Sequence, residues 1–348
     1  MTGEKPAPRV GIGKQLMELV GPFLGLLIVL ALVTILKPEL FWSAINLRTV
    51  ATQTVMVGLG AIGMTLIIVS GGIDLSAGSV IALSSVVTAL VLRDSGSTLL
   101  ALLSGIATGG ALGMFNGSLV AGVRVPFVRF RLGRLLQLLA ELAGGLPPFI
   151  VTLGTMGIAR GLAKYLADEQ KVDAPISWLS ELMMKSPSIP WLVVAPGVWV
   201  MAILAVVAAL VLRRTVFGVH VVATGSNEAT ARLCGIRVAR VKVSVYTLSG
   251  LLMGLAGVMQ FCRLNVGDPT TAVGKELDII AAVVIGGASL SGGRGTILGA
   301  MIGAFMMAIL ANGCALMSVP NYIQEILVGA IIVVAAAVDR FRGHAQRT

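Results

Sequence analysis

The sequence carries little charge for its length. Of its 348 residues, 12% are charged and 56% are hydrophobic, whereas a soluble domain has about 25% charged residues. So few charged side chains leave too little polar surface to keep a chain of this size in water. The composition therefore excludes a soluble protein and favours one whose surface faces lipid.

Residues that bind metals or act as nucleophiles are scarce as well. The chain has three cysteines, Cys234, Cys262 and Cys314, without CxxC spacing, and two histidines that lie far apart in sequence, His220 and His344. Such a pattern predicts neither a disulfide framework nor a metal site. Because no pair of nucleophile and base is recognisable either, we expect no catalytic residue, no metal and no cofactor.

A phosphate-binding loop for ATP is also missing. Gly13 and Lys14 are followed by Gln15, where the Walker A motif needs Ser or Thr, and Pro8 stands where its first Gly would be. The chain is therefore not expected to hydrolyse ATP by this route. Its net charge of +10 could suggest nucleic-acid binding, but the basic residues lie between apolar runs, as in membrane proteins, so we expect no nucleic-acid partner.

Apolar runs separated by polar or glycine-rich stretches are abundant. They predict an all-α protein, a polytopic transmembrane bundle of about ten helices. The runs near 78–92 and 278–290 are short and could be tilted, broken or re-entrant, so the number of spans could be as low as eight. The runs lie near 20–36, 50–70, 78–92, 98–122, 147–166, 191–212, 241–262, 278–290, 296–313 and 321–338.

The basic residues between the runs predict the orientation. With the N-terminus placed inside and the loops alternating, the inside segments hold 17 Lys and Arg residues and the outside segments hold 7. Because cytoplasmic loops carry the excess of basic residues, this predicts N-in, C-in topology. We therefore expect a cytoplasmic tail at 1–19, a transmembrane domain at 20–338 and a second cytoplasmic tail at 339–348.

The segment 71–79, GGIDLSAGS, interrupts one hydrophobic stretch. Its glycines can break a helix, and Asp74 or Ser76 can cap the next one. A capped turn is the simpler interpretation. The alternative is a broken helix that lines a pathway, because Asp74 in the membrane would be costly without a function. A similar string at 286–293 is either a chance echo or an internal repeat of the kind found in transporters.

A further segment stands out within the longest polar loop on the inside, 213–240. Ser226 or Asn227 can cap a helix that Gly235 can end. Such a helix, over 227–234, is too short to be stable alone in water. It is therefore either a solvated turn or an element that packs against a cytosolic partner.

Several of these segments resemble a known family. The segments are GGIDLSAGSVIAL at 71–83, PPFIVTLGTMGIARGLA at 147–163, the stretch 223–259, ELDIIAAVVIGGASLSGGRGTILGAMIGA at 276–304 and the pair Asn116-Gly117. They are similar to the permease subunits of ATP-binding cassette (ABC) importers for monosaccharides such as ribose, xylose and galactose. The resemblance covers nearly the whole chain from about residue 20 and implies a non-catalytic, multi-pass protein of the bacterial inner membrane that translocates a monosaccharide.

The resemblance also implies partners and functional residues. The partners are a second permease copy, expected as a homodimer, a cytosolic ABC ATPase, an extracytoplasmic sugar-binding protein and membrane lipid. Residues that couple to the ATPase are expected at Gly225, Ser226, Asn227, Ala231, Arg232, Leu233, Gly235 and Ile236. Residues of the substrate pathway are expected at Asp74, Ser76, Asn116, Thr152, Thr155, Arg160, Ser289 and Ser291.

One stretch departs from the family pattern. In the family, the span with Asn-Gly leads almost directly to Pro-Pro-Phe, whereas here an insertion at about 126–146 intervenes. Arg129, Arg131 and Arg134 precede a run of leucines in it, which indicates a basic amphipathic helix at the cytoplasmic surface.

Two other functions are weighed against an importer subunit. A secondary transporter working alone would need a titratable group inside the membrane, for which Asp74 and Glu325 are the candidates. An enzyme embedded in the membrane would need catalytic residues, and none is recognisable. Uptake with and without an ATPase subunit separates the first alternative from an importer.

Overall fold

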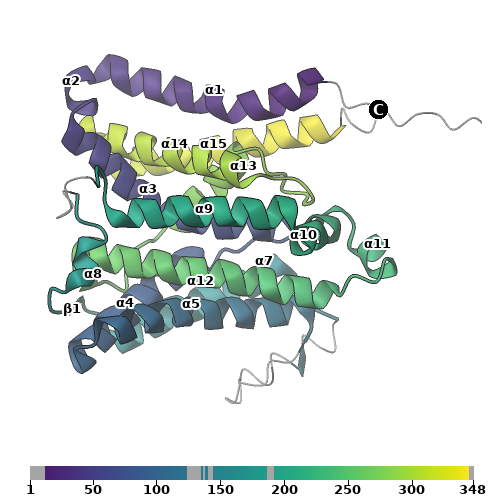
Figure 1. Ribbon diagram of the computed structural model, residues 1–348, viewed down its shortest axis with the longest axis horizontal. Coiled ribbons are helices and arrows are strands. Elements are labelled where there is room, and N and C mark those ends of the chain that lie inside the picture. Colours follow the sequence, from purple (N-terminus) through teal and green to yellow (C-terminus); the bar gives the residue numbers. More distant parts are fainter. Residues whose placement is uncertain (1–11, 124–134, 136–137, 140–143, 186–191, 345–348) are drawn as a thin grey trace, which may run out of the picture.

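The computed structural model describes residues 12–123, 135, 138–139, 144–185 and 192–344 (Figure 1). The expected insertion at about 126–146 therefore lies mostly outside the described residues. Within the described part, the chain is mostly helical, and the apolar runs of the sequence account for its long helices.

Each of the ten apolar runs coincides with a helix. In the described part of the chain, six of these helices, α3, α4, α5, α9, α12 and α14, are long and apolar enough to cross a membrane. A helical membrane protein is thus confirmed, while ten spans stay a prediction. The helices are α1 (Ile12–Leu36), α3 (Ala44–Val69), α4 (Ala77–Ser95), α5 (Thr98–Ala121), α7 (Pro148–Leu166), α9 (Pro196–Arg214), α12 (Val238–Leu264), α13 (Lys275–Ile285), α14 (Ile297–Leu316) and α15 (Asn321–His344).

Short elements join these helices. Four are short helices: α2 (Pro38–Phe41), α8 (Trp178–Glu181), α10 (Val216–Ser226) and α11 (Glu228–Leu233). The strands β1 (Val172–Asp173) and β2 (Val266–Gly267) pair antiparallel, with Val172 opposite Gly267. This two-stranded pair is the departure from the all-α class that the sequence predicts.

The long helices run side by side along the longest axis of the molecule (Figure 1). Helices α2 and α8 and strand β1 lie at one end, which we call the α8 end. Helix α11 projects from the opposite end, which we call the α11 end. The beginning of α1 and the end of α15 both lie toward the α11 end, so the two termini of the bundle are on the same side.

Glycines allow the central helices to pack closely. Helix α3 is the most enclosed, with 94% of its apolar window buried. Helices α5 and α12 cross at Gly109 and Gly113, where an added Cβ would lie 2.2 Å from the carbonyl oxygens of Gly250 and Tyr246, respectively. No larger residue fits there, so backbone packs on backbone, as small residues permit in membrane helices.

Candidate functional site

The segment 71–79 begins where α3 ends. Gly71 adopts a positive φ of 85°. Its N–H donates to the carbonyl of Ile68 at 2.9 Å, and the N–H of Gly72 donates to that of Ile67 at 3.0 Å. This pair of hydrogen bonds closes the C-terminus of a helix through a left-handed residue, a conformation that glycine adopts without a Cβ penalty.

The similar string at 286–293 ends α13 in the same way. Gly287 has a φ of 90°, its N–H donates to the carbonyl of Val284 at 2.9 Å, and the N–H of Ala288 donates to that of Val283 at 3.1 Å. The two strings thus share a geometry, although Gly71 corresponds to Gly287 rather than to the glycine before it. Because this way of ending a helix is common and the registers of the two strings differ by one residue, the shared geometry leaves both the chance echo and the internal repeat open.

Four of the eight expected pathway residues form one buried cluster. Asp74 Oδ1 accepts hydrogen bonds from the backbone N–H and the hydroxyl of Ser76, at 2.8 and 2.6 Å. Asn116 of α5 donates through Nδ2 to Ser76 Oγ at 3.1 Å, and Thr152 of α7 donates to the carbonyl of Ile73 at 3.3 Å. All four side chains are buried, so the segment joins α5 and α7 inside the bundle.

This arrangement corrects the capping expected of Asp74 and Ser76. Ser76 occupies the N-cap position of α4, but its side chain makes no cap hydrogen bond to that helix. Its hydroxyl donates to Asp74 instead. The carboxylate of Asp74 is therefore held by donors of the residue two positions further on, in the short-range pattern typical of aspartate in turns.

Tyr246 of α12 lies beside this cluster and was not predicted. Its side chain is buried, an added Cβ on Gly72 would lie 2.5 Å from its hydroxyl, and it interacts electrostatically with Asp74. Among the described residues, the hydroxyl of Tyr246 and Oδ1 of Asn116 have no hydrogen-bond partner. Unpaired buried polar atoms call for an explanation, and a water molecule or a polar ligand would supply one. In the sequence, the feature that could have pointed to Tyr246 is a tyrosine hydroxyl within an otherwise apolar run.

The other four expected pathway residues lie elsewhere. Thr155 is buried one turn further along α7. Arg160 lies nearer the α8 end and donates to the carbonyls of Pro269 and Thr271. In the loop after α13, Ser289 is buried and Ser291 is exposed.

The segments 71–79 and 286–293, which we call the glycine loops, meet the end of α10 at the α11 end of the bundle. The N–H of Gly293 donates to the carbonyl of Val69 at 2.9 Å. An added Cβ on Gly225 would lie 1.8 Å from the same carbonyl oxygen, and one on Gly292 would lie 3.0 Å from Gly71 Cα. The expected coupling residue Gly225 therefore packs directly between both loops.

Helix α11 confirms the short helix expected at 227–234. Asn227 Oδ1 accepts from the N–H of Thr230 at 2.9 Å, so Asn227 caps the helix, whereas Ser226 donates to the carbonyl of Val222. Gly235 follows the helix with a φ of 81°, which suits a glycine at a helix C-terminus.

An ion pair between Glu228 and Lys242 joins α11 to the start of α12, and a second one, between Glu228 and Arg232, lies within α11. Glu228 accepts from Arg232 and from Lys242, both at 2.7 Å. Burial raises the pKa of Glu228, but these two cations outweigh that effect and lower the pKa below its ordinary value. Arg232 thus already has an acidic partner within the chain.

The expected coupling residues differ in their exposure. Leu233 is 88% exposed at the tip of α11, whereas Ala231 is buried against its own chain. The N–H of Ile236 donates to the carbonyl of Ala231, and its side chain packs against the core. Leu233 is therefore an exposed apolar residue of α11, and Ala231 is a packing residue.

The segment 213–240, expected as one polar loop, contains a second helix. Helix α10 begins after Thr215, whose Oγ1 accepts from the N–H of Gly218 at 3.2 Å, and ends at Ser226. Its 11 residues are apolar but too few to cross a membrane, which is why the sequence pattern did not single it out. It carries Gly225 to the two glycine loops.

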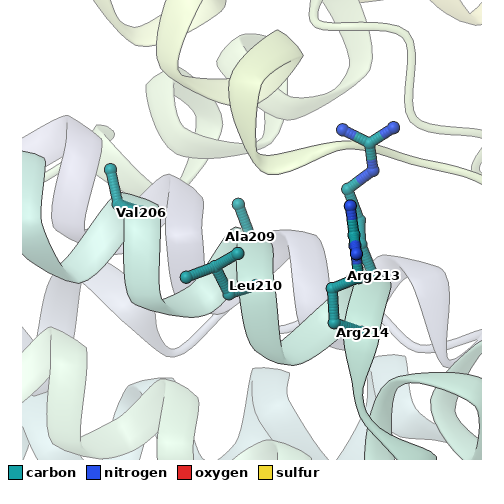
Figure 2. A pocket seen from close by; sticks show the side chains of 5 residues that line it. All are labelled: Val206, Ala209, Leu210, Arg213 and Arg214. Atoms are coloured by element: carbon teal, nitrogen blue, oxygen red, sulfur yellow. The ribbon is translucent and has the colours of Figure 1, made fainter.

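A shallow hollow of about 400 Å³ lies on the surface of α9. Figure 2 shows three apolar side chains along the helix and two arginines at its C-terminal end. None of the expected pathway residues lines it, so it is no part of the polar cluster. Its lining residues are Val206, Ala209, Leu210, Arg213 and Arg214.

Comparison with known proteins places this arrangement in a family. Residues 46–336 match the family described as the permease component of branched-chain amino acid transport systems. The matched part contains the polar cluster, both glycine loops, α10 and α11. No solved structure matches the chain.

Relatives with assigned names are similar over nearly their whole length. The ribose import permease protein of Bacillus subtilis is 38% identical over 336 residues, which cover 93% of each chain. That of Escherichia coli K12 is 36% identical over 316 residues, 91% of this chain and 92% of the relative. The L-arabinose ABC transporter permease protein of Azospirillum brasilense is 32% identical over 342 residues, 98% of this chain and 93% of the relative.

Proposed function

The chain belongs to the permease family of branched-chain amino acid transport systems, and we propose that it works as the membrane subunit of an ABC importer for a monosaccharide. Similarity over nearly the full length to permeases named for two different pentoses carries this proposal. It is a multi-pass protein of the inner membrane. The energy of transport comes from a separate ATPase, since the sequence has no phosphate-binding loop of its own.

The ten long helices are proposed to cross or enter the membrane with both termini in the cytoplasm. The shared end of α1 and α15 supports an even number of crossings (Figure 1), and Arg213 and Arg214 at the α11 end of α9 agree with the excess of basic residues on the inside. The α11 end is then cytoplasmic, and the α8 end faces the sugar-binding protein.

Helix α11 is proposed to receive the ATPase. A six-residue helix is not stable on its own in water, and this one projects from the bundle with Leu233 exposed. A force on α11 reaches α10 directly, and α10 packs through Gly225 against the loops that end α3 and α13. The loop after α3 carries Asp74, so the contacts connect the docking helix to the polar cluster.

A second copy of the chain is proposed to pack against α7. One face of this helix is open: an added Cβ on Gly154, Gly157 or Gly161 would meet no atom within 4 Å. Glycines spaced in this way allow membrane helices to approach closely, and a homodimer would cover this face.

Uptake by the reconstituted complex tests the proposal. The permease is placed in proteoliposomes with its ATPase and binding protein, and uptake of labelled D-ribose, L-arabinose and L-leucine is measured with ATP. We expect uptake of a sugar and none of leucine. Uptake that proceeds without the ATPase and follows a proton gradient would instead support a secondary transporter, and uptake of leucine alone would place the chain with the amino acid permeases.

A further inference from the structure

The segment 268–278 enters the bundle as irregular chain. It leaves β2 at the α8 end and becomes helical at Lys275, where α13 begins. Helix α13 has 11 residues, or about 16 Å of helix, roughly half of the ~30 Å hydrocarbon core. Its beginning reaches the middle of α3, because an added Cβ on Gly60 would lie 2.5 Å from Ile279 Cδ1. The irregular chain before α13 thus lies at membrane depth.

Arg160 holds this irregular chain in place. Its Nη1 donates to the carbonyl oxygens of Pro269 and Thr271, at 2.8 and 2.7 Å. Gln260 of α12 donates through Nε2 to Thr271 Oγ1 at 2.8 Å. A charged residue inside a membrane is costly and marks a function. Here the guanidinium satisfies carbonyl groups that no helix satisfies, so Arg160 acts as a positioning residue.

One side of the segment is open. Val273 is 71% exposed and Leu277 is 45% exposed, and an added Cβ on Gly274 would meet no atom within 4 Å. Irregular backbone at membrane depth is tolerated only where it is buried in protein or lines a water-filled space. The open side therefore does not face lipid.

Two acceptor oxygens, one within the segment and one on the neighbouring helix α12, have no donor in the described structure. They are Oε1 of Gln260 and Oε2 of Glu276, both buried. Gln260 is 9% exposed as a whole, and Glu276 interacts electrostatically with Arg160. Buried acceptors without donors are destabilising. A ligand rich in hydroxyl groups supplies donors, and a sugar is such a ligand.

We propose that the segment 268–278 lines the substrate pathway and that Gln260 and Glu276 accept hydroxyl groups of the passing sugar. Arg160 keeps the segment at the depth where these acceptors lie. The identity of the ligand rests on the proposed function, whereas the position of the pathway does not. The sequence alone singled out Arg160 and none of the other residues.

Cysteine labelling tests the position without any sugar. Val273→Cys is introduced with Cys234→Ser and treated in membranes with a charged, membrane-impermeant thiosulfonate. Val207→Cys on the outer face of α9, where Val207 is 49% exposed, is the matched control. We expect V273C to react and V207C to stay unlabelled, because lipid excludes a charged reagent. V273C that stays as inert as V207C would overturn the proposal.

The positioning role of Arg160 is tested in the same protein, which carries Val273→Cys and Cys234→Ser. Arg160→Ala lets the segment leave the position in which Val273 faces the open side, so the labelling rate of V273C should change by about tenfold, the shift that one hydrogen bond from a charged donor can cause. Arg160→Lys should bring the rate part of the way back to that of V273C alone. An unchanged rate in Arg160→Ala would show that Arg160 does not hold the segment.

Transport kinetics test the acceptors. Glu276→Gln and Gln260→Ala should raise the KM for D-ribose or L-arabinose while membrane insertion and ATPase association stay normal, and Val207→Ala should change neither. Transport by both variants at the wild-type KM would remove Gln260 and Glu276 from the pathway. If V273C is labelled but the wild type transports neither sugar, the pathway stands and the assignment of the substrate fails.

Discussion

Asp74 is a buried carboxylate held by donors from its own turn. Removing it leaves the N–H and the hydroxyl of Ser76 without their acceptor. Each unpaired buried donor costs about 1–3 kcal/mol. We therefore expect Asp74→Ala to lower the melting temperature of the purified protein in detergent by several degrees, whereas Asp74→Asn, which keeps an acceptor oxygen, should lower it less.

Asp94 offers a matched control for this experiment. It also carries a carboxylate, but its side chain is 65% exposed and pairs with Arg93 on the surface. Exposed pairs contribute about 0–1 kcal/mol, so Asp94→Ala should melt close to the wild type. Equal melting temperatures for Asp74→Ala and Asp94→Ala would contradict the hydrogen-bonded cluster.

Gly225 packs where no side chain fits. Because an added Cβ would lie 1.8 Å from the carbonyl oxygen of Val69, Gly225→Ala must separate α10 from the glycine loops. We expect normal membrane insertion and ATPase binding but a loss of ATP-driven uptake. Gly329→Ala is the control, since its Cβ would meet no atom within 4 Å. Unimpaired uptake in Gly225→Ala would show that this contact does not transmit the motion.

Single residues were predictable where a motif surrounded them. Asp74, Ser76 and Asn116 lie in recognisable strings, and the structure brings them together. Tyr246 and Gln260 escaped because one polar residue in an apolar run does not reveal which neighbour it faces. Gly72 lies against Tyr246 and Thr271 against Gln260, both in irregular segments outside α12, and that proximity is a property of the packed bundle.

At the scale of elements, the proposed docking of the ATPase on α11 can be tested. Leu233→Asp puts a charge where an apolar anchor is 88% exposed. We expect the ATPase no longer to co-purify with the permease, while the permease still inserts into the membrane. Ile176→Asp adds the same charge to a residue that is 84% exposed at the α8 end, and it should leave co-purification unchanged. Co-purification of the ATPase with Leu233→Asp would rule out this anchor.

The end of the insertion at about 126–146 lies beside the end of α5. The N–H of Leu146 donates to the carbonyl of Leu119 at 3.0 Å, so the chain returns next to the end of α5. Removing 126–145 and joining Val125 to Leu146 should therefore leave the bundle intact. Size-exclusion profiles and sugar uptake of the deletion variant check this expectation. Normal insertion without any uptake would show that the insertion has acquired a function.

The observed helices match the predicted ones closely where the length of an apolar run and its lack of polar residues both indicate a membrane helix. Ten apolar runs became ten helices because a run of about 20 apolar residues has no stable alternative in lipid. Helices α10 and α13 were harder to read because each has 11 residues, which fits a buried helix, a loop or a half-span equally well. Helix α13 lies between Gly274 and Gly286, whereas α10 lies between Thr215 and Asn227.

At the scale of the whole molecule, the orientation in the membrane can be tested directly. Cys234 is exposed beside α11, whereas Cys314, although near the far end of α14, is buried. An impermeant thiol reagent should label Cys234 only from the cytoplasmic side, and Cys314 should not react from either side. Ile176→Cys replaces Cys314 as the reporter for the outside. Labelling of Cys234 in intact cells would reverse the proposed orientation.

The contact between Leu146 and the end of α5 also has a practical use. Because Leu146 lies next to Leu119, another domain can be inserted between them while both of its ends stay close together. A fluorescent protein inserted here would be joined at both ends and would lie on the same side of the bundle as α11. Energy transfer from it to a dye on the ATPase could then follow docking during the transport cycle in living cells.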